Sequence, residues 1–380
     1  APVLSQVTAV TTPTNDNTSS YTFSSTEAGT ISYGGSCSSS TTTATADNNS
    51  ITFNALSDGT YSDCTIQVTD SASNKSDNLS VTSFTVDTTA PVLSQVTAVT
   101  NPTNDNTSNY TFSSTEAGTI AYSGSCSSDN TSATTDNNTV TFNAVADGNY
   151  SNCSIKVTDN ASNQSETLLV SAFSVDTVSP TVSSVTSSNP DGNYFNGDNI
   201  TITITFTETV IVDNSSGTPQ IRLETGDGDQ YATYLSGNST TVLSFNYLVR
   251  SLDSSSDLDY VGTGSLSLNS GTIRDNATND ATLTLPSPGA TNSLGANKSL
   301  VIGGSSQEAY IKASNSGDND SFGSSLALEN DTLVVGAVGE DSNQTTITND
   351  TTASSDDNNS NSGAVYIYKR SGTSWSQQAY

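Results

Sequence analysis

Histidine and methionine are absent from the 380 residues, and lysine and arginine together number only 9. Without histidine the chain has no Ser-His-Asp or Cys-His arrangement for nucleophilic catalysis. It also has no Gly-x-x-x-x-Gly-Lys loop and no Rossmann glycine run to hold a nucleotide. Carboxylate pairs for glycoside hydrolysis remain an alternative, since their separation in space defines them. Because the acids recur in turns of repeated units, we expect a protein that is not an enzyme.

Basic residues are scarce beside 38 aspartates and glutamates, and the formal net charge is −29. This charge repels nucleic-acid phosphates and anionic membrane surfaces, so nucleic-acid binding is excluded. Two interpretations of the acidity remain open. The carboxylates keep the chain soluble in a salty medium, or some of them hold divalent cations between domains.

Long apolar runs are also missing, and none approaches the roughly 20 residues that cross a bilayer. We therefore expect no membrane insertion in this stretch, and no signal peptide is visible. The chain opens on a repeat boundary and stops inside another unit. We expect a mature piece or window of a longer protein, with anchors and export signals elsewhere.

The most informative feature present is a repeat with a period of 89 residues: residues 1–10 return unchanged as residues 90–99. A fixed period of this kind is typical of a tandem array of structural units. The linker Val86-Asp87-Thr88 also returns as Val175-Asp176-Thr177. We predict four domains, at residues 1–89, 90–178, 179–303 and 304–380.

Short runs of alternating apolar residues fill each copy, and helix signals are lacking. Tyr21 and Phe23 alternate with threonine and serine, and turn formers separate such runs. In the third unit Ile200, Ile202 and Ile204 alternate with threonine in the same way. Six or seven short strands in about 90 residues predict a β-sandwich. The predicted fold class is all-β, with tandem immunoglobulin-like sandwiches followed by an incomplete propeller-type blade.

Cysteine occurs four times, twice per repeat and 27 positions apart, at Cys37, Cys64, Cys126 and Cys153. This spacing predicts one disulfide inside each copy and an oxidising compartment outside the cytosol. A zinc site is the alternative, but histidine and Cys-x-x-Cys are both missing. Strand parity, with a strand expected from residue 31 to residue 37, directs the sulfurs into the core.

The segments Asp58-Gly59-Thr60-Tyr61 and Asp70-Ser71-Ala72-Ser73-Asn74, with the linker that follows, resemble the bacterial immunoglobulin-like repeats of large surface adhesins. The resemblance implies calcium near domain junctions and a secreted or cell-surface location. The alternative is that Asp70 and Asp87 are turn residues that bond their own backbone. The matching positions for calcium are Asp70, Asp87 and Glu27 in the first copy and Asp159, Asp176 and Glu116 in the second.

The third unit resembles another bacterial immunoglobulin-like module of secreted multidomain proteins, on the residues 257–260, 266–275 and 293–298. Gly226-Asp227-Gly228-Asp229 predicts a hairpin turn between two strands. Four acids of this unit either converge on a cation or lie in solvated loops: Glu208, Asp257, Asp259 and Asp275.

The last unit resembles the FG-GAP repeat of integrin-like β-propellers, on the residues 322–328, 331–338 and 362–368, with Val338 in place of the proline. Residues 307–310 recur as residues 377–380, so one blade is present and the next has begun. The calcium loop of such blades is absent, because Asp318-Asn319-Asp320 supplies only part of it. We expect Glu340 and Asp341 in a solvated turn, and a mobile polar loop over residues 345–361.

Together these features predict an extracellular structural or adhesive protein, a rod or filament subunit on a bacterial cell surface. Its partners would be other copies of itself or neighbouring surface proteins, and its role attachment or contact with cells or matrix. One alternative is a receptor whose propeller recognises a glycan or protein. Another is the accessory rod of a secreted hydrolase.

Overall fold

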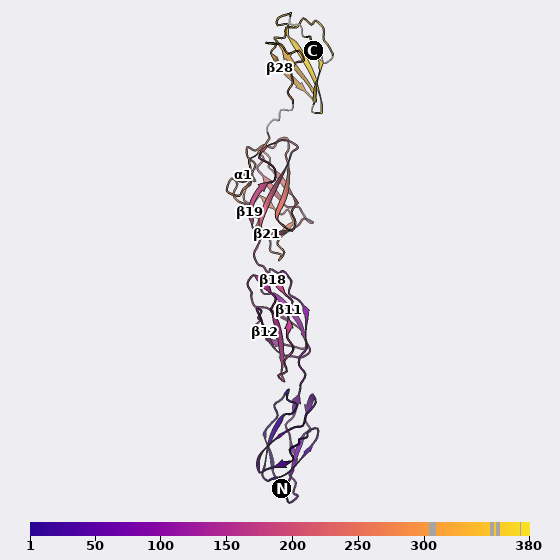
Figure 1. Cartoon of the computed structure of the whole chain (residues 1–380), viewed down its shortest axis with the longest axis vertical. Coiled ribbons are helices and arrows are strands. Elements are labelled where there is room, and N and C mark those ends of the chain that lie inside the picture. The colour runs from indigo at the N-terminus through magenta and orange to yellow at the C-terminus, as the bar shows by residue number, and fades with distance from the viewer. Residues whose placement is uncertain (304–308, 350–352, 355–357, 373) are drawn as a thin grey trace.

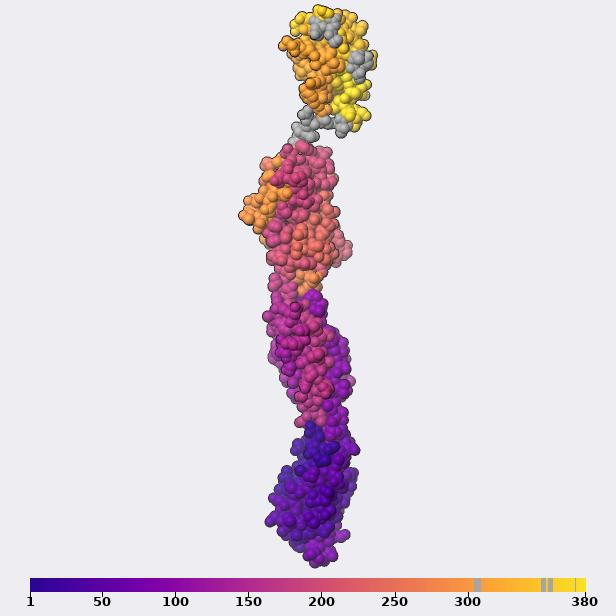
Figure 2. Space-filling view, in the orientation of Figure 1, coloured from indigo at the N-terminus to yellow at the C-terminus, as the bar shows by residue number. Residues whose placement is uncertain are grey.

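The computed structural model describes residues 1–303, 309–349, 353–354, 358–372 and 374–380. Four separate hydrophobic cores follow one another along the chain. The corresponding bodies form a single row, with the N-terminus at one end and the C-terminus in the last body (Figure 1). The space-filling view is correspondingly long and narrow (Figure 2). In the described part, no helix has the length and apolar character needed to span a membrane.

The fold is all-β, as predicted, apart from the short helix α1 (Leu294–Asn297). No helix was expected here, and α1 forms because Ser293 caps it by accepting a hydrogen bond from the backbone N–H of Ala296. The helix packs against β19, and its Leu294 is buried in the core of the third unit.

The first unit has one sheet of order β1-β2-β5 and a second of order β4-β3-β7-β8, with the ribbon β6-β9 beside them. The core lies between the sheets and holds the stacked rings of Tyr21, Phe53 and Phe84. Strand bounds are β1 (Leu4–Thr8), β2 (Ser20–Ser25), β3 (Gly29–Gly34), β4 (Thr43–Ala44), β5 (Asp47–Thr52), β6 (Gly59–Tyr61), β7 (Thr65–Thr69), β8 (Leu79–Ser80) and β9 (Phe84–Val86).

The disulfide of this unit joins Cys37 to Cys64, with their Cα atoms 5.2 Å apart and both side chains buried. The prediction of the bond is therefore confirmed, but the expected strand over residues 31–37 is too long. Strand β3 ends at Gly34 because Gly35 adopts a φ of +76° and turns the chain. A Cβ at Gly35 would lie 2.1 Å from the carbonyl oxygen of Asp63, so no larger residue fits this turn.

The second unit repeats this arrangement, including the disulfide between Cys126 and Cys153. The elements correspond one to one with those of the first unit and enclose an equivalent core. Strand bounds are β10 (Leu93–Thr97), β11 (Asn109–Ser114), β12 (Gly118–Ser123), β13 (Ser132–Ala133), β14 (Asp136–Thr141), β15 (Gly148–Tyr150), β16 (Ser154–Asp159), β17 (Leu168–Leu169) and β18 (Phe173–Val175).

The third unit is built around the long strand β21, which pairs with β19 and β24 and, in its last part, with β26. Strands β22 and β23 form the predicted hairpin, joined by residues 224–229. Strand bounds are β19 (Val182–Ser187), β20 (Gly192–Tyr194), β21 (Asn199–Asp213), β22 (Gln220–Leu223), β23 (Gln230–Ser236), β24 (Thr240–Leu248), β25 (Leu266–Ser267), β26 (Thr272–Arg274) and β27 (Leu300–Ile302).

The last unit is one antiparallel sheet of order β28-β29-β30-β31. Its strands are β28 (Phe322–Glu329), β29 (Thr332–Ala337), β30 (Ala364–Ser371) and β31 (Ser374–Ala379). The polar segment 345–361 connects β29 to β30, and its residues 350–352 and 355–357 lie outside the described residues. The predicted mobility of this loop therefore stays a prediction.

Candidate metal centres at the unit junctions

Three carboxylates converge where the linker of the first unit meets the second unit. Asp87 directly follows β9, Glu116 lies in the turn between β11 and β12, and Asp159 ends β16. One oxygen of each lies within 4.8 Å of the others. The structure thus brings together Asp87, Glu116 and Asp159, which the sequence had assigned to different copies of the repeat.

An asparagine fastens this cluster to the linker. The backbone N–H of Asn163 donates to Oδ1 of Asp159 at 2.8 Å, and its side-chain Nδ2 donates to Oδ2 at 2.9 Å. The same Nδ2 donates to the backbone carbonyl of Asp87 at 2.8 Å, across the junction. Asn163 therefore fixes the second unit and the linker relative to each other, and we call it the junction asparagine.

The linker is held from the first unit as well. The backbone N–H and the hydroxyl of Thr88 donate to Asp58 at 2.9 and 2.7 Å, and the hydroxyl of Thr89 donates at 2.7 Å. These bonds, the one from Thr89 first, hold the pKa of Asp58 below its usual value. Asn15 adds a hydrogen bond to the carbonyl of Ser162 in the second unit at 3.2 Å. The linker is thus hydrogen-bonded to both units.

The electrostatics of the cluster favour a cation. Burial first, and then the charges of Asp87 and Asp159, raise the pKa of Glu116. Within the described residues, no ion pair with lysine, arginine or the amino terminus involves these three side chains. Their mutual repulsion is therefore not offset by a basic side chain.

The donor set can be tested against particular metals. All three donors are carboxylate oxygens, which hard cations prefer, and no nitrogen or sulfur ligand is present. Two oxygens that bind one calcium at about 2.4 Å lie at most about 4.8 Å apart. The carboxylates of Asp87, Glu116 and Asp159 meet this limit, and backbone carbonyls or water would complete the coordination. The residues present fit calcium.

The second junction has the same construction, although the third unit differs in length and sequence. Asp176 follows β18, Glu208 lies within β21, and Asp275 follows β26, with carboxylate oxygens within 4.8 Å of one another. Nδ2 of Asn279 donates to Oδ2 of Asp275 and to the backbone carbonyl of Asp176, both at 2.7 Å. Burial first, and then Asp176 and Asp275, raise the pKa of Glu208.

Of the acids predicted in the third unit, Glu208 and Asp275 join this cluster, whereas Asp257 and Asp259 do not belong to it. Oδ2 of Asp259 accepts the backbone N–H of Gly289 at 2.9 Å. This side chain therefore holds the segment around Gly289 and lies outside the junction cluster. The sequence signal that would have found the site is Asp-x-Ala-Ser/Thr-Asn, which occurs three times. Its copies are residues 70–74, 159–163 and 275–279.

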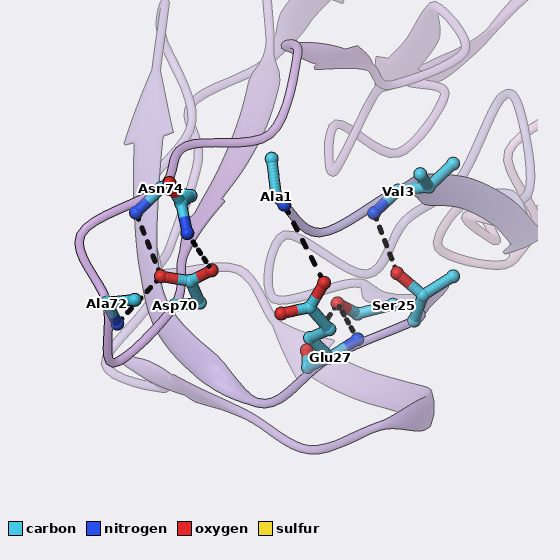
Figure 3. A network of polar contacts seen from close by, with 8 residues as sticks. Ala1, Val3, Ser25, Glu27, Asp70, Ala72 and Asn74 are labelled. Atoms are coloured by element: carbon cyan, nitrogen blue, oxygen red, sulfur yellow. Dashed lines mark hydrogen bonds and ion pairs between the residues drawn. The ribbon is translucent and has the colours of Figure 1, made fainter.

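Asp70 and Glu27 occupy the equivalent place in the first unit (Figure 3). Asp70 accepts backbone N–H groups of Ala72 and Asn74, both at 2.8 Å, and the side-chain amide of Asn74 at 2.8 Å. These bonds, with Asn74 first, lower the pKa of Asp70. Glu27 lies 3.7 Å from the amino group of Ala1. Among the described residues no third carboxylate joins this pair.

The loop that presents Asp70 repeats the hydrogen bonds of the loop that presents Asp159, which come from the backbone and side chain of the asparagine four residues on. Because no third carboxylate joins Asp70 and Glu27 among the described residues, this copy, which we call the unfilled copy, is a matched control for substitutions at the first junction.

Glu340 in the last unit does not lie in a solvated turn as expected. Its side chain is 1% exposed and accepts hydrogen bonds from Nδ2 of Asn315 and the hydroxyl of Tyr380 at 3.0 Å, and from the hydroxyl of Tyr366 at 3.1 Å. The turn is buried because segments distant in sequence cover it. Asp341 is half-buried, and its carboxylate accepts the backbone N–H of Asn361, which lies 20 positions away.

Comparison with known proteins identifies one segment. Residues 305–347 match the model of the FG-GAP repeat. This confirms the resemblance of the last unit to that repeat. No curated protein sequence matches the chain.

Two solved structures show only distant similarity. The full extracellular region of plexin A4 is 12% identical over 89% of this chain and 25% of its own, with a TM-score of 0.20. Salmonella alpha-2-macroglobulin reacted with methylamine is 10% identical over 88% of this chain and 25% of its own, with a TM-score of 0.16. The chain spans about a quarter of the length of each.

Proposed function

We propose that the chain is an extracellular structural protein, not an enzyme, whose sandwiches form a rod stiffened by calcium and carry the FG-GAP unit at one end. The observation that carries the proposal is the pair of carboxylate clusters, each shared between a linker and the unit that follows. Such a site would bind calcium most tightly when the linker and the following unit keep the arrangement that brings the three carboxylates together. Bound calcium would therefore stabilise this arrangement and oppose bending of the chain at the junction.

Further support comes from the two disulfides, which favour an oxidising compartment. The repeats resemble the immunoglobulin-like domains of bacterial surface adhesins, and a stiff rod serves to hold a terminal unit away from a surface. We propose a bacterial cell-surface location and a role in attachment to cells or matrix. Partners would be neighbouring surface proteins or other copies of the chain.

Bound calcium would supply the positive charge that the clusters lack. Asp87, Glu116 and Asp159 would hold it at the first junction, and Asp176, Glu208 and Asp275 at the second. Isothermal titration of the metal-free chain with calcium tests this assignment. We expect two sites per chain, and a chain that binds no calcium would contradict the proposal.

Replacing the junction asparagine with alanine, Asn163→Ala, is expected to weaken calcium binding at the first junction roughly 10-fold. The substitution removes the bonds from Nδ2 to Asp159 and to the linker carbonyl, so both lose their fixed positions. Calcium titration measures the change. The control is Asn74→Ala, which removes the same side chain from the unfilled copy and should leave both sites intact.

Calcium binding at the first junction is expected to weaken as the pH falls. Because the pKa of Glu116 is raised above its ordinary value of 4.5, protons compete for this carboxylate already above that pH. Affinity is complete above the raised pKa and is lost as the pH falls through it. Calcium titrations at a series of pH values measure the onset, and Glu116→Gln should remove this component of the pH dependence.

A further inference from the structure

The sequence Gln-x-Ala-Tyr occurs at both ends of the FG-GAP unit, at residues 307–310 and 377–380. The two tyrosines have opposite environments. Tyr380 is 9% exposed and belongs to the core of the unit, whereas Tyr310 is 75% exposed. The tyrosine of this short sequence therefore fills a pocket at position 380 and is left in solvent at position 310.

The pocket of Tyr380 recognises both the backbone and the side chain. The backbone N–H and carbonyl of Tyr380 pair with the carbonyl and N–H of Thr348 at 3.1 and 3.0 Å. The ring packs against Tyr366, with the centroids 4.8 Å apart. The hydroxyl donates to Oε1 of Glu340 at 3.0 Å and also bonds to the hydroxyl of Ser342.

Glu340 makes the pocket selective for a hydroxyl-bearing ring. It is almost completely buried, and a buried carboxylate is costly unless hydrogen-bond donors surround it. Asn315 and Tyr366 supply two donors, and the incoming tyrosine hydroxyl supplies the third. A phenylalanine in this place would fill the space and leave the carboxylate short of a donor.

Tyr310 makes no comparable contacts with the residues that the structure describes. In the described part of the unit, its one aromatic or cation contact is with the ammonium group of Lys312, 5.5 Å from the ring centroid. Ala309 beside it is also exposed. A large exposed tyrosine with a polar tip is typical of residues that anchor protein interfaces.

We propose that Tyr310 is a docking residue, and that its partner is the Glu340 pocket of the FG-GAP unit in a second molecule. Ala309 and Tyr310 would present to the pocket the same Ala-Tyr pair, with its phenol, as Ala379 and Tyr380 do. The unit before it in this chain is built around one large sheet with a different core. Docking requires that the second molecule's own Tyr380 leave the pocket, so two unaltered chains associate weakly.

A variant in which the Glu340 pocket is vacant makes the proposal testable in the whole 380-residue chain. The acceptor is Tyr310→Ala/Tyr380→Gly, which has a vacant pocket and no docking tyrosine of its own. The donor is the unaltered chain, in which the pocket is filled and Tyr310 is free. Sedimentation velocity with a fluorescently labelled acceptor, in a calcium chelator to exclude association through the metal sites, measures the complex.

We expect a one-to-one complex that the donor Tyr310→Ala forms roughly 30-fold more weakly, as for a hot-spot tyrosine. Adding Glu340→Gln to the acceptor, which removes the charge and keeps the shape, should also weaken the complex. Circular dichroism checks that the acceptors fold, and Tyr310→Ala/Tyr380→Ala, which also leaves the ring position vacant, replaces the first acceptor if it does not. The proposal is overturned if donors with and without Tyr310 bind a folded acceptor equally, or if Glu340→Gln has no effect.

Discussion

Replacing Asp159 with asparagine is expected to weaken calcium binding at the first junction by about 100-fold or more, because even residues that only support a ligand contribute roughly 10- to 100-fold. Asp159 is the most buried member of its cluster and the one that the junction asparagine orients. Titration calorimetry should then report one strong site in place of two. The remaining site, at Asp176, Glu208 and Asp275, should keep its affinity.

The matched control is Asp70→Asn in the first unit. It removes the same charge and the same contacts to an asparagine, but among the described residues no third carboxylate joins Asp70 and Glu27. Two strong sites should remain in this variant. If Asp70→Asn and Asp159→Asn lowered calcium binding equally, the acids would act through overall charge, and the junction site would have to be abandoned.

Removing the disulfide of the first unit with Cys37→Ala/Cys64→Ala is expected to lower the stability of that unit by about 3.5 kcal/mol. The bond closes a loop with a sequence separation of 27, so its loss frees the unfolded chain. For a unit of this size the melting temperature should fall by about 15 °C. Scanning calorimetry of the whole chain, with limited proteolysis to identify the unit that opens first, measures the change.

The second unit serves as the internal reference for this experiment. Its own disulfide between Cys126 and Cys153 has the same separation, so Cys126→Ala/Cys153→Ala should cause a shift of similar size in that unit alone. An unchanged transition in both variants would show that the bonds contribute no stability to the folded units.

Much of the fold was predictable because the repeat displays the same pattern twice. Alternation around Tyr21 and Phe23 predicts a strand that buries every second residue, and β2 does so. The disulfides followed from spacing alone. The end of β3 was not predictable from alternation, because it depends on the close approach of Gly35 to the backbone of Asp63.

The carboxylate clusters were predictable only in part. Asp87, Glu116 and Asp159 were all named from the resemblance to adhesin repeats, but their assembly across two units needed the structure. In the third unit Glu208 was grouped with Asp257, Asp259 and Asp275, and only Asp275 joins it, because the third member, Asp176, belongs to the preceding linker. Glu340 was misplaced because its burial depends on Asn315 and Tyr380, which are 25 and 40 positions away.

Small-angle X-ray scattering of the full chain, with calcium and then with a chelator, tests the central claim most directly. The account predicts the scattering of a stiff rod in calcium and of a more flexible chain after chelation. The variant Asp87→Asn/Asp176→Asn, which lacks the linker carboxylate of both junctions, should resemble the chelated chain even in calcium. Identical scattering with and without calcium would contradict the account, because the junction carboxylates would then have no part in stiffening the rod.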